Sequence, residues 1–547
     1  MSVEELEDFD VDLDNESDCE IEEVNFRDLS WEKVNPGSPF HVQDYVFYGL
    51  HGLHPRYEER SENEIFFFEI IFPDEIFEML ADFTNVRAHI FLEKETENLT
   101  PKSRGKNWKD VSANEMKKFF ACLFLMGIVK KPTIESFWST DGLIETPFFS
   151  SSKCLSRDRF QSILRFLRFA DYNRLDRNDP LRKISHFVEK MKTIIQNSYM
   201  PSEKVAVDKV LLLFKGRLYF RNFIPSKRSR YGIKIFALVD EYGYLWNFHV
   251  HTVASDLRLP SSVTADAHLG FSGNIVASLM SPLFDMNYVV FCDNFFISEK
   301  LAEFLITKRT HLCGTTRFNR LPKAIQENFP KVGENPKFFR KERILISCFS
   351  EKKQSGVKKI AILDTKGVAS TEDRNIRKKG GGIVTVKRPK SLSEYNKYMG
   401  MVDETDAVLH PYDCTRKSMN WTTKVGIHLM QRMLMNAYSL HRQHTCTPGT
   451  SFLKFSLSCI QHLFDTSGIG RRAGGRGGRP KLSTTEVLEN HCPSKIPSSE
   501  KKKNPSLRCR VCSSKGIRKE TRLCCNLCQE KPPLCAHPCF NVWHNYS

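Results

Sequence analysis

Between residues 205 and 317 the chain alternates short apolar runs with polar breaks, which is the pattern of buried strands. The runs are VAVDKVLLLF, YGIKIFALVD, YLWNFHVHT, NYVVFCDNFF and THLCGTTRF. The intervening SEKLAEFLITKR has helical spacing instead. Strands and helices mixed in one stretch predict an α/β core.

Helical patterns lie on both sides of this core, over residues 64–204 and again over 420–465. In VSANEMKKFFACLFLMG, Ser112 and Glu115 form a capping-box pattern before a long apolar segment. SRDRFQSILRFLRFAD repeats apolar residues at helical spacing, at Phe160, Ile163, Leu164 and Leu167. The arginines of that helix form a basic face, which is either solvated or in contact with DNA phosphates: Arg157, Arg159, Arg165 and Arg168.

The length of 547 residues predicts several domains. The sequence contains no run of about 18 consecutive apolar residues, so we expect no transmembrane helix. Residues 1–23 contain 12 Asp and Glu but no Lys or Arg, which predicts a disordered acidic arm and argues against a signal peptide. Removing those 12 negative charges from the net +16 leaves +28 on the rest of the chain. A body this basic is either a solvated surface or a partner for a polyanion such as nucleic acid.

Acidic residues interrupt the apolar runs at a few positions. Asp208 lies inside VAVDKVLLLF, Asp293 ends VVFC, and Asp403 and Asp406 stand three apart in GMVDETDAV, on one face of a helix. Each has an ordinary interpretation as a strand-edge, turn, capping or exposed helix acid. Together they could hold two divalent cations, because buried carboxylates need partners and such cation pairs drive phosphodiester exchange.

The segment after Asp208 interleaves cations with aromatic residues. Its aromatic residues are Phe214, Tyr219, Phe220 and Tyr231. Phosphate contacts and base stacking require this mixture, whereas a basic sheet surface over core aromatics would explain the aromatics alone. The predicted DNA-binding cations are Lys215, Arg217, Arg221, Lys227, Arg228, Arg230 and Lys234.

Seven of the 17 cysteines fall in the last 39 residues, in paired spacings that predict zinc binding. The ordered ligands are Cys509, Cys512, Cys525, Cys528, Cys535, Cys539 and His544. Two tetrahedral Zn²⁺ sites need eight ligands, so we expect His491 to be the eighth, with His537 and Cys524 as local alternatives. The order suggests a cross-brace of interleaved pairs, in which the two structural Zn²⁺ ions supply most of the folding energy.

Taken together, the segments resemble the piggyBac transposase family from about residue 64 to the C-terminus. The resemblance rests on NWKDVSANEMKKFF, FWST, VAVDKVLLLFKGRLYFRNFIPSKRSRYGIK, VVFCDNFF, CGTTRFNR, YNKYMGMVDETDAV and the cysteine-rich tail, in that order. It implies an RNase H-like catalytic core split by an insertion domain, and a helical dimerisation and DNA-binding domain built from both flanking segments. It further implies a nuclear homodimer that cuts and pastes double-stranded DNA between terminal inverted repeats and TTAA targets.

The resemblance also assigns roles to the acidic residues. Asp208, Asp293 and Asp403 would be the ligands of two catalytic Mg²⁺ ions, and Asp406 would be a fourth acid close to them. The chain departs from the family at Lys209, where an acidic residue is usual. Alternation along a strand would point Lys209 away from Asp208. This reversed charge leaves open a derivative that binds DNA or chromatin without cutting, or one that acts mainly through its zinc module.

These patterns divide the chain as follows. We expect a disordered arm (1–60), a helical domain (61–204 and 412–466), a catalytic domain (205–330 and 389–411) with an insertion (331–388), a Gly/Arg-rich linker (467–490) and a zinc-binding domain (491–547). The linker's GGRP resembles a minor-groove element, although flexible linkers have the same composition. The lysines of KKKNPSLRCR could serve nuclear import.

Overall fold

The computed structural model divides the chain into two compact units, residues 1–471 and 472–547. It describes residues 31–38, 40, 46–57, 63–95, 108–171, 175, 179–224, 230–252, 267–353, 356–377, 383–418, 420–445, 449–468, 493–498, 502, 504–525, 528 and 530–544. The acidic segment 1–23 and residues 469–490 of the linker lie outside the described residues. The predictions for those segments therefore stay predictions.

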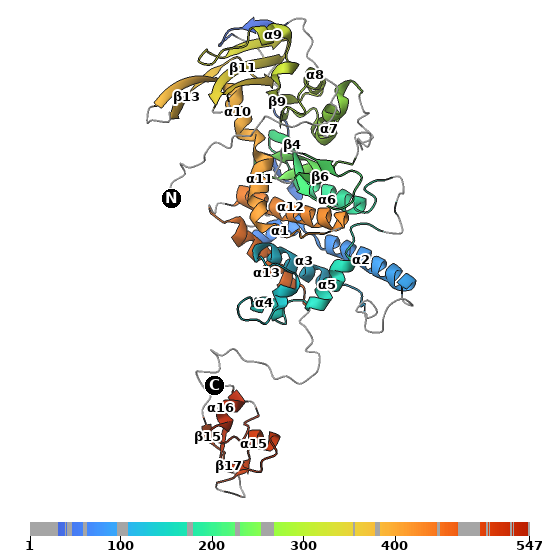
Figure 1. Cartoon of the computed structure of the whole chain (residues 1–547), viewed down its shortest axis with the longest axis vertical. Helices are drawn as coiled ribbons and strands as arrows, with labels where there is room; N and C mark the ends of the chain where they lie inside the picture. The colour runs from blue at the N-terminus through green and yellow to red at the C-terminus, as the bar shows by residue number, and fades with distance from the viewer. Residues whose placement is uncertain are drawn as a thin grey trace. The chain divides into compact units, whose positions relative to one another are not determined.

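A ten-stranded sheet forms the centre of the first unit (Figure 1). Its strand order is β1 (Glu32–Val34), β10 (Lys337–Lys341), β11 (Ile344–Lys353), β12 (Gly356–Asp364), β9 (His311–Thr316), β8 (Val289–Cys292), β4 (Lys204–Leu213), β6 (Tyr231–Asp240) and β5 (Asn222–Phe223). Strand β7 (Leu245–Val250) also pairs with β6. The five apolar runs of the sequence are therefore strands, as expected.

The middle of the sheet has the RNase H-like arrangement that the resemblance implies. Strand β6 pairs antiparallel with both β7 and β4, whereas β8 pairs parallel with both β4 and β9. Parallel strands need helical crossovers, and α7 (Gly270–Met280) and α8 (Glu299–Thr307) follow β7 and β8 in the chain. The residue that follows β8 consequently lies beside the middle of β4, because Cys292 at the end of β8 pairs with Val207.

The segment expected to be an insertion, residues 331–388, largely extends this sheet. Strands β10, β11 and β12 continue it through the antiparallel pairing of β12 with β9. The last part is a separate hairpin of β13 (Thr371–Arg377) and β14 (Ile383–Pro389). The chain then returns through α10 (Lys390–Met399), which packs on β4, β8, β9 and β12, and α11 (Met401–Leu409), which packs on β4 and β6.

A helical region covers the rest of the first unit. Its N-terminal members are α1 (Glu64–Ile71), α2 (Asp74–Glu95), α3 (Ala113–Ile128), α4 (Pro147–Ser150), α5 (Arg157–Phe166) and α6 (Ser185–Ser198). Its C-terminal members, α12 (Trp421–His444) and α13 (Phe452–Thr466), pack on α1 and α3 (Figure 1). Segments that precede and follow the central strands in the sequence therefore form one helical region. The amide of Asn436 on the buried helix α12 exchanges two 2.8 Å hydrogen bonds with the backbone of Leu245, tying the helices to the sheet.

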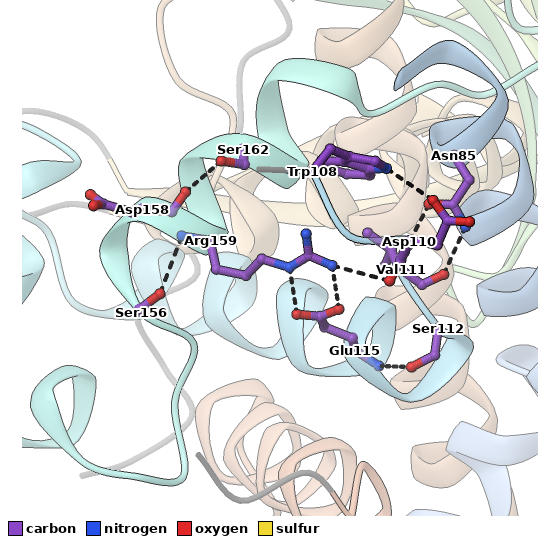
Figure 2. A network of polar contacts seen from close by, with 10 residues as sticks. All are labelled: Asn85, Trp108, Asp110, Val111, Ser112, Glu115, Ser156, Asp158, Arg159 and Ser162. Carbon is purple, nitrogen blue, oxygen red and sulfur yellow. Dashed lines mark hydrogen bonds and ion pairs between the residues drawn. The ribbon is translucent and has the colours of Figure 1, made fainter. Parts of the chain in front are cut away.

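The capping-box residues and one arginine of α5 form a polar network between helices (Figure 2). Ser112 accepts a 3.3 Å hydrogen bond from the Glu115 N–H, as predicted for an N-cap. The Glu115 carboxylate, however, accepts two bonds of 2.7 and 2.6 Å from Arg159, whose guanidinium also lies 4.9 Å from the Trp108 ring. Arg159 therefore joins α5 to α3 and is neither a solvated nor a DNA-facing cation.

The second unit, residues 472–547, is small. Strand β15 (Pro493–Lys495) pairs with β18 (Leu523–Cys525), and β16 (Leu507–Arg508) pairs with β17 (Glu520–Thr521). Two short helices complete it, α15 (Arg510–Ser514) and α16 (Cys539–His544). Five of the eight buried residues in its core cluster are cysteines, at positions 509, 512, 525, 535 and 539. Such a core has little apolar surface of its own to stabilise the fold.

Between β1 and α1 lie β2 (Gly52–Leu53), which pairs with β3 (Tyr199–Met200), and a 3-10 turn. A further short helix, α9 (Lys323–Glu327), precedes β10. Among the helices that the structure describes, none is both long and apolar enough to cross a membrane.

Candidate functional site

Asp208 and Asp293 lie side by side on adjacent parallel strands. In the β4–β8 pairing Val207 stands opposite Cys292, so the next residue on each strand is an aspartate. Asp208 lies in the middle of β4, between the buried residues Val207 and Lys209. Asp293 directly follows the fully buried strand β8. The two carboxylates, 85 residues apart in sequence, are thus fixed to one rigid element.

Asp403 joins them from a third element, the first turn of α11. Burial raises the pKa of Asp208 well above its usual range, and the negative charges of Asp293 and Asp403 raise it further. The backbone N–H and the charge of Lys209 act in the opposite direction. The pKa of Asp208 thus reports a local excess of negative charge in a dry position. We call Asp208, Asp293 and Asp403 the carboxylate site.

Local hydrogen bonds use one oxygen of each strand carboxylate. Asp208 Oδ1 accepts from the Lys209 N–H at 2.7 Å, and Asp293 Oδ1 accepts from the Phe295 N–H at 2.9 Å. The Phe296 N–H also donates to the Asp293 carbonyl at 3.2 Å. Asp293 therefore is a turn residue, as its ordinary interpretation proposed. Since a carboxylate has about four acceptor positions, the turn leaves room for a cation as well.

Lys209 reaches the carboxylate site directly. Its Nζ lies 3.4 Å from Asp293 Oδ2, and both side chains are largely buried, at 7% and 18% exposure. Alternation along β4 predicted that Lys209 points away from Asp208, and that direction stays a prediction. The sequence pattern did not reveal that Asp293, at the end of the neighbouring strand, is within reach of Lys209.

Asp406 has a different partner from the other three acids. It forms an ion pair with Arg432, a buried residue of α12. Arg432 also donates to the Thr405 hydroxyl at 3.1 Å, which fixes α11 against α12. In this structure the fourth predicted acid thus anchors the helix that carries Asp403. A direct role toward metal remains a prediction.

The donor chemistry of the carboxylate site fits divalent cations. Oxygen ligands from separate elements, gathered where their charges repel one another, are what Mg²⁺ sites use. The carboxylate site is looser than the cysteine clusters. Among the described residues, groups of three or more His, Cys, Asp or Glu whose ligand atoms all lie within 4.8 Å of one another contain cysteines, and the three aspartates do not form such a group. The three aspartates would therefore close around a cation rather than hold a tightly formed cage.

The basic stretch after Asp208 divides into exposed and buried cations. Lys215, Arg217, Arg221 and Arg230 are exposed, whereas Lys227 and Arg228 lie outside the described residues. Lys234 is buried at 7% exposure, with its Nζ 5.4 Å from the centre of the Phe295 ring. Its surroundings correct the expectation of a surface phosphate contact, because the side chain lies in the sheet beside the carboxylate site.

Three exposed aromatic rings accompany the exposed cations. Tyr219, Phe223 and Tyr231 are 69%, 51% and 40% exposed, while Phe214 and Phe220 belong to the core. Phe223 and Tyr231 have ring centres 4.7 Å apart across the β5–β6 pair, and Arg221 lies 4.7 Å from the Tyr231 ring. We call Tyr219, Arg221, Phe223 and Tyr231 the aromatic patch. The sequence analysis did not single out Phe223, because its position opposite Tyr231 becomes visible only in the strand pairing.

In the second unit, four cysteines form one compact cluster. The sulfurs of Cys509, Cys512, Cys535 and Cys539 lie within 4.8 Å of one another, and all four residues are buried. Burial raises the pKa of Cys509, but hydrogen bonds to its sulfur from the N–H groups and the thiols of Cys512 and Cys535 outweigh burial and lower the pKa to about 7. Four thiols arranged in this way are a structural zinc-type ligand set.

Cys525, Cys528 and His544 form a second cluster within the same limit. Cys528 Sγ lies 3.4 Å from His544 Nε2. His544 Nδ1 lies 2.9 Å from the Phe540 carbonyl, which can only accept, so Nδ1 carries the proton and Nε2 is left for a metal. The pairs Cys509–Cys512 and Cys535–Cys539 share one cluster, and the pair that lies between them in the sequence, Cys525–Cys528, shares the other with His544. This interleaving confirms the cross-brace. We call residues 493–544 the cysteine module.

The second cluster has three of the four ligands that a tetrahedral ion needs. Neither local alternative belongs to it: Cys524 Sγ points to the Lys495 carbonyl at 4.0 Å, and His537 is exposed. His491 itself lies outside the described residues. It precedes Pro493 by two residues, and Pro493 pairs with Cys525 across β15 and β18.

Comparison with known proteins finds matches over both units. Residues 63–438 match the family model described as transposase IS4, and residues 490–545 match one described as DDE_Tnp_1-like zinc finger. Human PiggyBac transposable element-derived protein 3 is 23% identical over 469 residues, 83% of this chain and 74% of that protein. Human PiggyBac transposable element-derived protein 2 is 24% identical over 383 residues, 66% of this chain and 62% of that protein.

A solved structure also resembles the chain. It is the cryo-EM structure of a piggyBac transposase synaptic complex with hairpin DNA, with a TM-score of 0.63 and 23% identity, covering 89% of this chain and 97% of that chain. At this identity the likeness shows that the fold is shared.

Proposed function

The chain belongs to the piggyBac-type transposase family, and we propose that it is a DNA transposase that excises and integrates DNA at TTAA sites. The observation that carries this proposal is the carboxylate site. Three acids from β4, the end of β8 and α11 act on one another, so that burial and the charges of Asp293 and Asp403 together raise the pKa of Asp208. An arrangement that costs free energy without a cation is expected where a cation is used.

In the proposed reaction the chain's own residues hold the metal ions and position the reacting groups. Asp208, Asp293 and Asp403 would hold two Mg²⁺ ions, which supply charge stabilisation and an activated nucleophile for phosphodiester hydrolysis and strand transfer. Asp208 and Asp293 are fixed by the sheet, and α11 brings Asp403 to them while Asp406 and Arg432 hold that helix. Pre-set ligands of this kind lower the cost of orienting the reacting groups.

We further propose that the exposed cations and the aromatic patch bind DNA beside the carboxylate site. Lys215, Arg217 and Arg230 offer phosphate contacts, and the rings of Tyr219, Phe223 and Tyr231 offer stacking surfaces for unpaired bases. The proposed substrate is double-stranded DNA with terminal inverted repeats, bound by a homodimer in the nucleus. The solved relative, a transposase in a synaptic complex with hairpin DNA, supports this proposal.

An excision assay tests the proposal. Donor DNA flanked by the cognate inverted repeats and TTAA is incubated with Mg²⁺ and either the wild-type chain or Asp293→Asn. We expect wild-type excision and a loss of about 10³-fold or more in the variant, because one metal-holding charge is removed. DNA binding should change little. Wild-type protein that binds the ends but never cleaves them would contradict the proposal.

One observation favours a second function, DNA binding without strand transfer. Lys209 places a positive charge 3.4 Å from Asp293, where the proposed reaction needs a metal ion. A chain derived from a transposase could retain the DNA surface and the fold while this pair weakens cleavage. The same assay separates the two functions, since the second predicts end binding with no Mg²⁺-dependent product.

The cysteine module is proposed to bind two structural Zn²⁺ ions. The first would be held by Cys509, Cys512, Cys535 and Cys539, and the second by Cys525, Cys528, His544 and His491. The match of residues 490–545 to a zinc-finger family supports this assignment and begins one residue before His491. By resemblance to the family, the module is proposed to contact the transposon ends.

A further inference from the structure

Lys209 and Asp293 form an ion pair at the point where the carboxylate site would bind metal. The 3.4 Å contact joins Lys209 Nζ to Asp293 Oδ2, the oxygen left over when Oδ1 accepts the Phe295 N–H. With exposures of 7% and 18%, both side chains are shielded from solvent. An ion pair in such a position is screened by salt far less than a surface pair.

The Lys209 ammonium has a second partner nearby. It lies 5.0 Å from the centre of the Phe295 ring, within the range of a cation–π contact. Lys234 is on β6, the strand that pairs with β4, and its Nζ lies 5.4 Å from the centre of the same ring. Two buried lysines thus place their ammonium groups near one aromatic ring, two residues after Asp293. The ring therefore offers Lys209 a position that it could keep if Asp293 were occupied by another cation.

We propose that Lys209 is a tethered cation that competes with divalent metal for Asp293 and so lowers the metal affinity of the carboxylate site. The inference rests on the proposed function, because it requires metal to bind Asp293. When a metal binds, the Lys209 ammonium gives up Asp293 Oδ2 and keeps its contact with Phe295. The site thus needs a higher metal concentration to fill than the same carboxylates would need without the lysine.

The size of the effect on metal affinity follows from the electrostatic repulsion between Lys209 and the metal ion. A positive charge about 4 Å from a ligand oxygen repels an incoming dication by more than thermal energy, even at the effective dielectric constant of a protein surface. The lysine also stabilises the metal-free state, since Asp293 would otherwise be a buried carboxylate without that partner. Both effects reduce the free energy gained on metal binding.

The test is a Mn²⁺ titration followed by the electron paramagnetic resonance signal of free Mn²⁺, on full-length protein with its cysteine module loaded with zinc. Lys209→Met keeps the length and apolar stem of the side chain but removes its charge. The matched control is Lys341→Met, which removes a partly buried lysine that pairs with Glu299 and Glu303 on α8. Asp293→Asn identifies the binding that belongs to the carboxylate site.

We expect Lys209→Met to bind Mn²⁺ about tenfold more tightly than wild type, and Lys341→Met to bind as wild type does. Thermal unfolding should agree: relative to wild type, Lys209→Met has a lower Tm without added divalent metal and a larger rise in Tm on adding Mn²⁺. Lys209→Gln should behave in the same direction, and it serves if the methionine variant does not fold.

Two results would overturn the inference and are distinguishable. If wild type and Lys209→Met bind Mn²⁺ equally and Asp293→Asn abolishes binding, the metal site exists but Lys209 does not compete, so the proposed function stands alone. If no variant shows binding that depends on Asp293, the proposed metal site fails and the inference fails with it.

Discussion

The carboxylate site and the cysteine module both gather metal-type ligands, but they depend on metal in different ways. Asp208 and Asp293 are mounted on a ten-stranded sheet with a large apolar core of its own. In the cysteine module, by contrast, most of the buried core is the ligands themselves. The first region can fold before any cation binds, whereas the second has little else to hold it together.

This difference explains which ligand set tolerates a foreign group. The cysteine sulfurs lie within 4.8 Å of one another, and loss of one would remove part of the core. The carboxylate site accommodates Lys209 at 3.4 Å from Asp293 without disturbing the pairing of β4 and β8. A site carried by an independent scaffold can therefore change its chemistry while the fold persists.

The largest expected effect is the loss of one cysteine ligand. Cys512→Ser should unfold the cysteine module, because structural zinc contributes roughly 10–16 kcal/mol to such folds. The first unit should remain folded. Zinc content and limited proteolysis of the full chain measure both effects.

Cys524→Ser is the matched control, since Cys524 is also buried in the cysteine module, on β18, but belongs to neither cluster. It should retain zinc and protease resistance. Equal behaviour of the two serine variants would break the comparison.

A smaller effect is expected from the proposed eighth ligand. His491→Ala should reduce zinc from about two ions per chain to about one, because three ligands hold the ion far less tightly than four. His537→Ala, an exposed histidine outside both clusters, should keep two. Mass-spectrometric metal analysis after dialysis decides this, and two ions retained in His491→Ala would show that another group completes the second cluster.

The smallest effect concerns stability without metal at the carboxylate site. Burial, followed by the charges of Asp293 and Asp403, raises the pKa of Asp208 in the folded state. The folded chain then holds this proton more tightly than the unfolded chain, so stability falls as pH rises from the unfolded pKa of Asp through the higher folded one. Asp208→Asn removes that cost.

With chelator present at neutral pH, we expect Asp208→Asn to raise the Tm of the first unit by about 2 °C or more. The variant should also lose much of the decline in Tm between acidic and neutral pH. A variant less stable than wild type at neutral pH would contradict the account of a site strained by its own charges.

The sequence was sufficient where a pattern depends on neighbours along the chain. Alternating apolar runs predicted β4, β6 and β8, and the cysteine spacing predicted the two interleaved clusters. The family resemblance implied that Asp208, Asp293 and Asp403 meet, and the structure brings the first two onto adjacent strands. Sequence spacing alone could not have shown this, because 85 residues separate those two acids.

The sequence was insufficient where a side chain's partner comes from a distant segment. Arg159 was assigned to a basic face, but the Glu115 carboxylate on α3 binds it. Asp406 pairs with Arg432 on a helix that begins 15 residues later, and Lys234 is enclosed beside Phe295. In each case the charge pattern of one element was known, but the group that the charged side chain contacts lies on another.

Hydrogen exchange of the full chain with and without a zinc chelator tests the central claim most directly. We predict that chelation removes amide protection from residues 507–525 of the cysteine module, while the amides of β4 and β8 in the carboxylate site stay protected. Protection that persists in the cysteine module, or that is lost in both regions together, would contradict the claim that the fold of the cysteine module depends on metal whereas the fold around the carboxylate site does not.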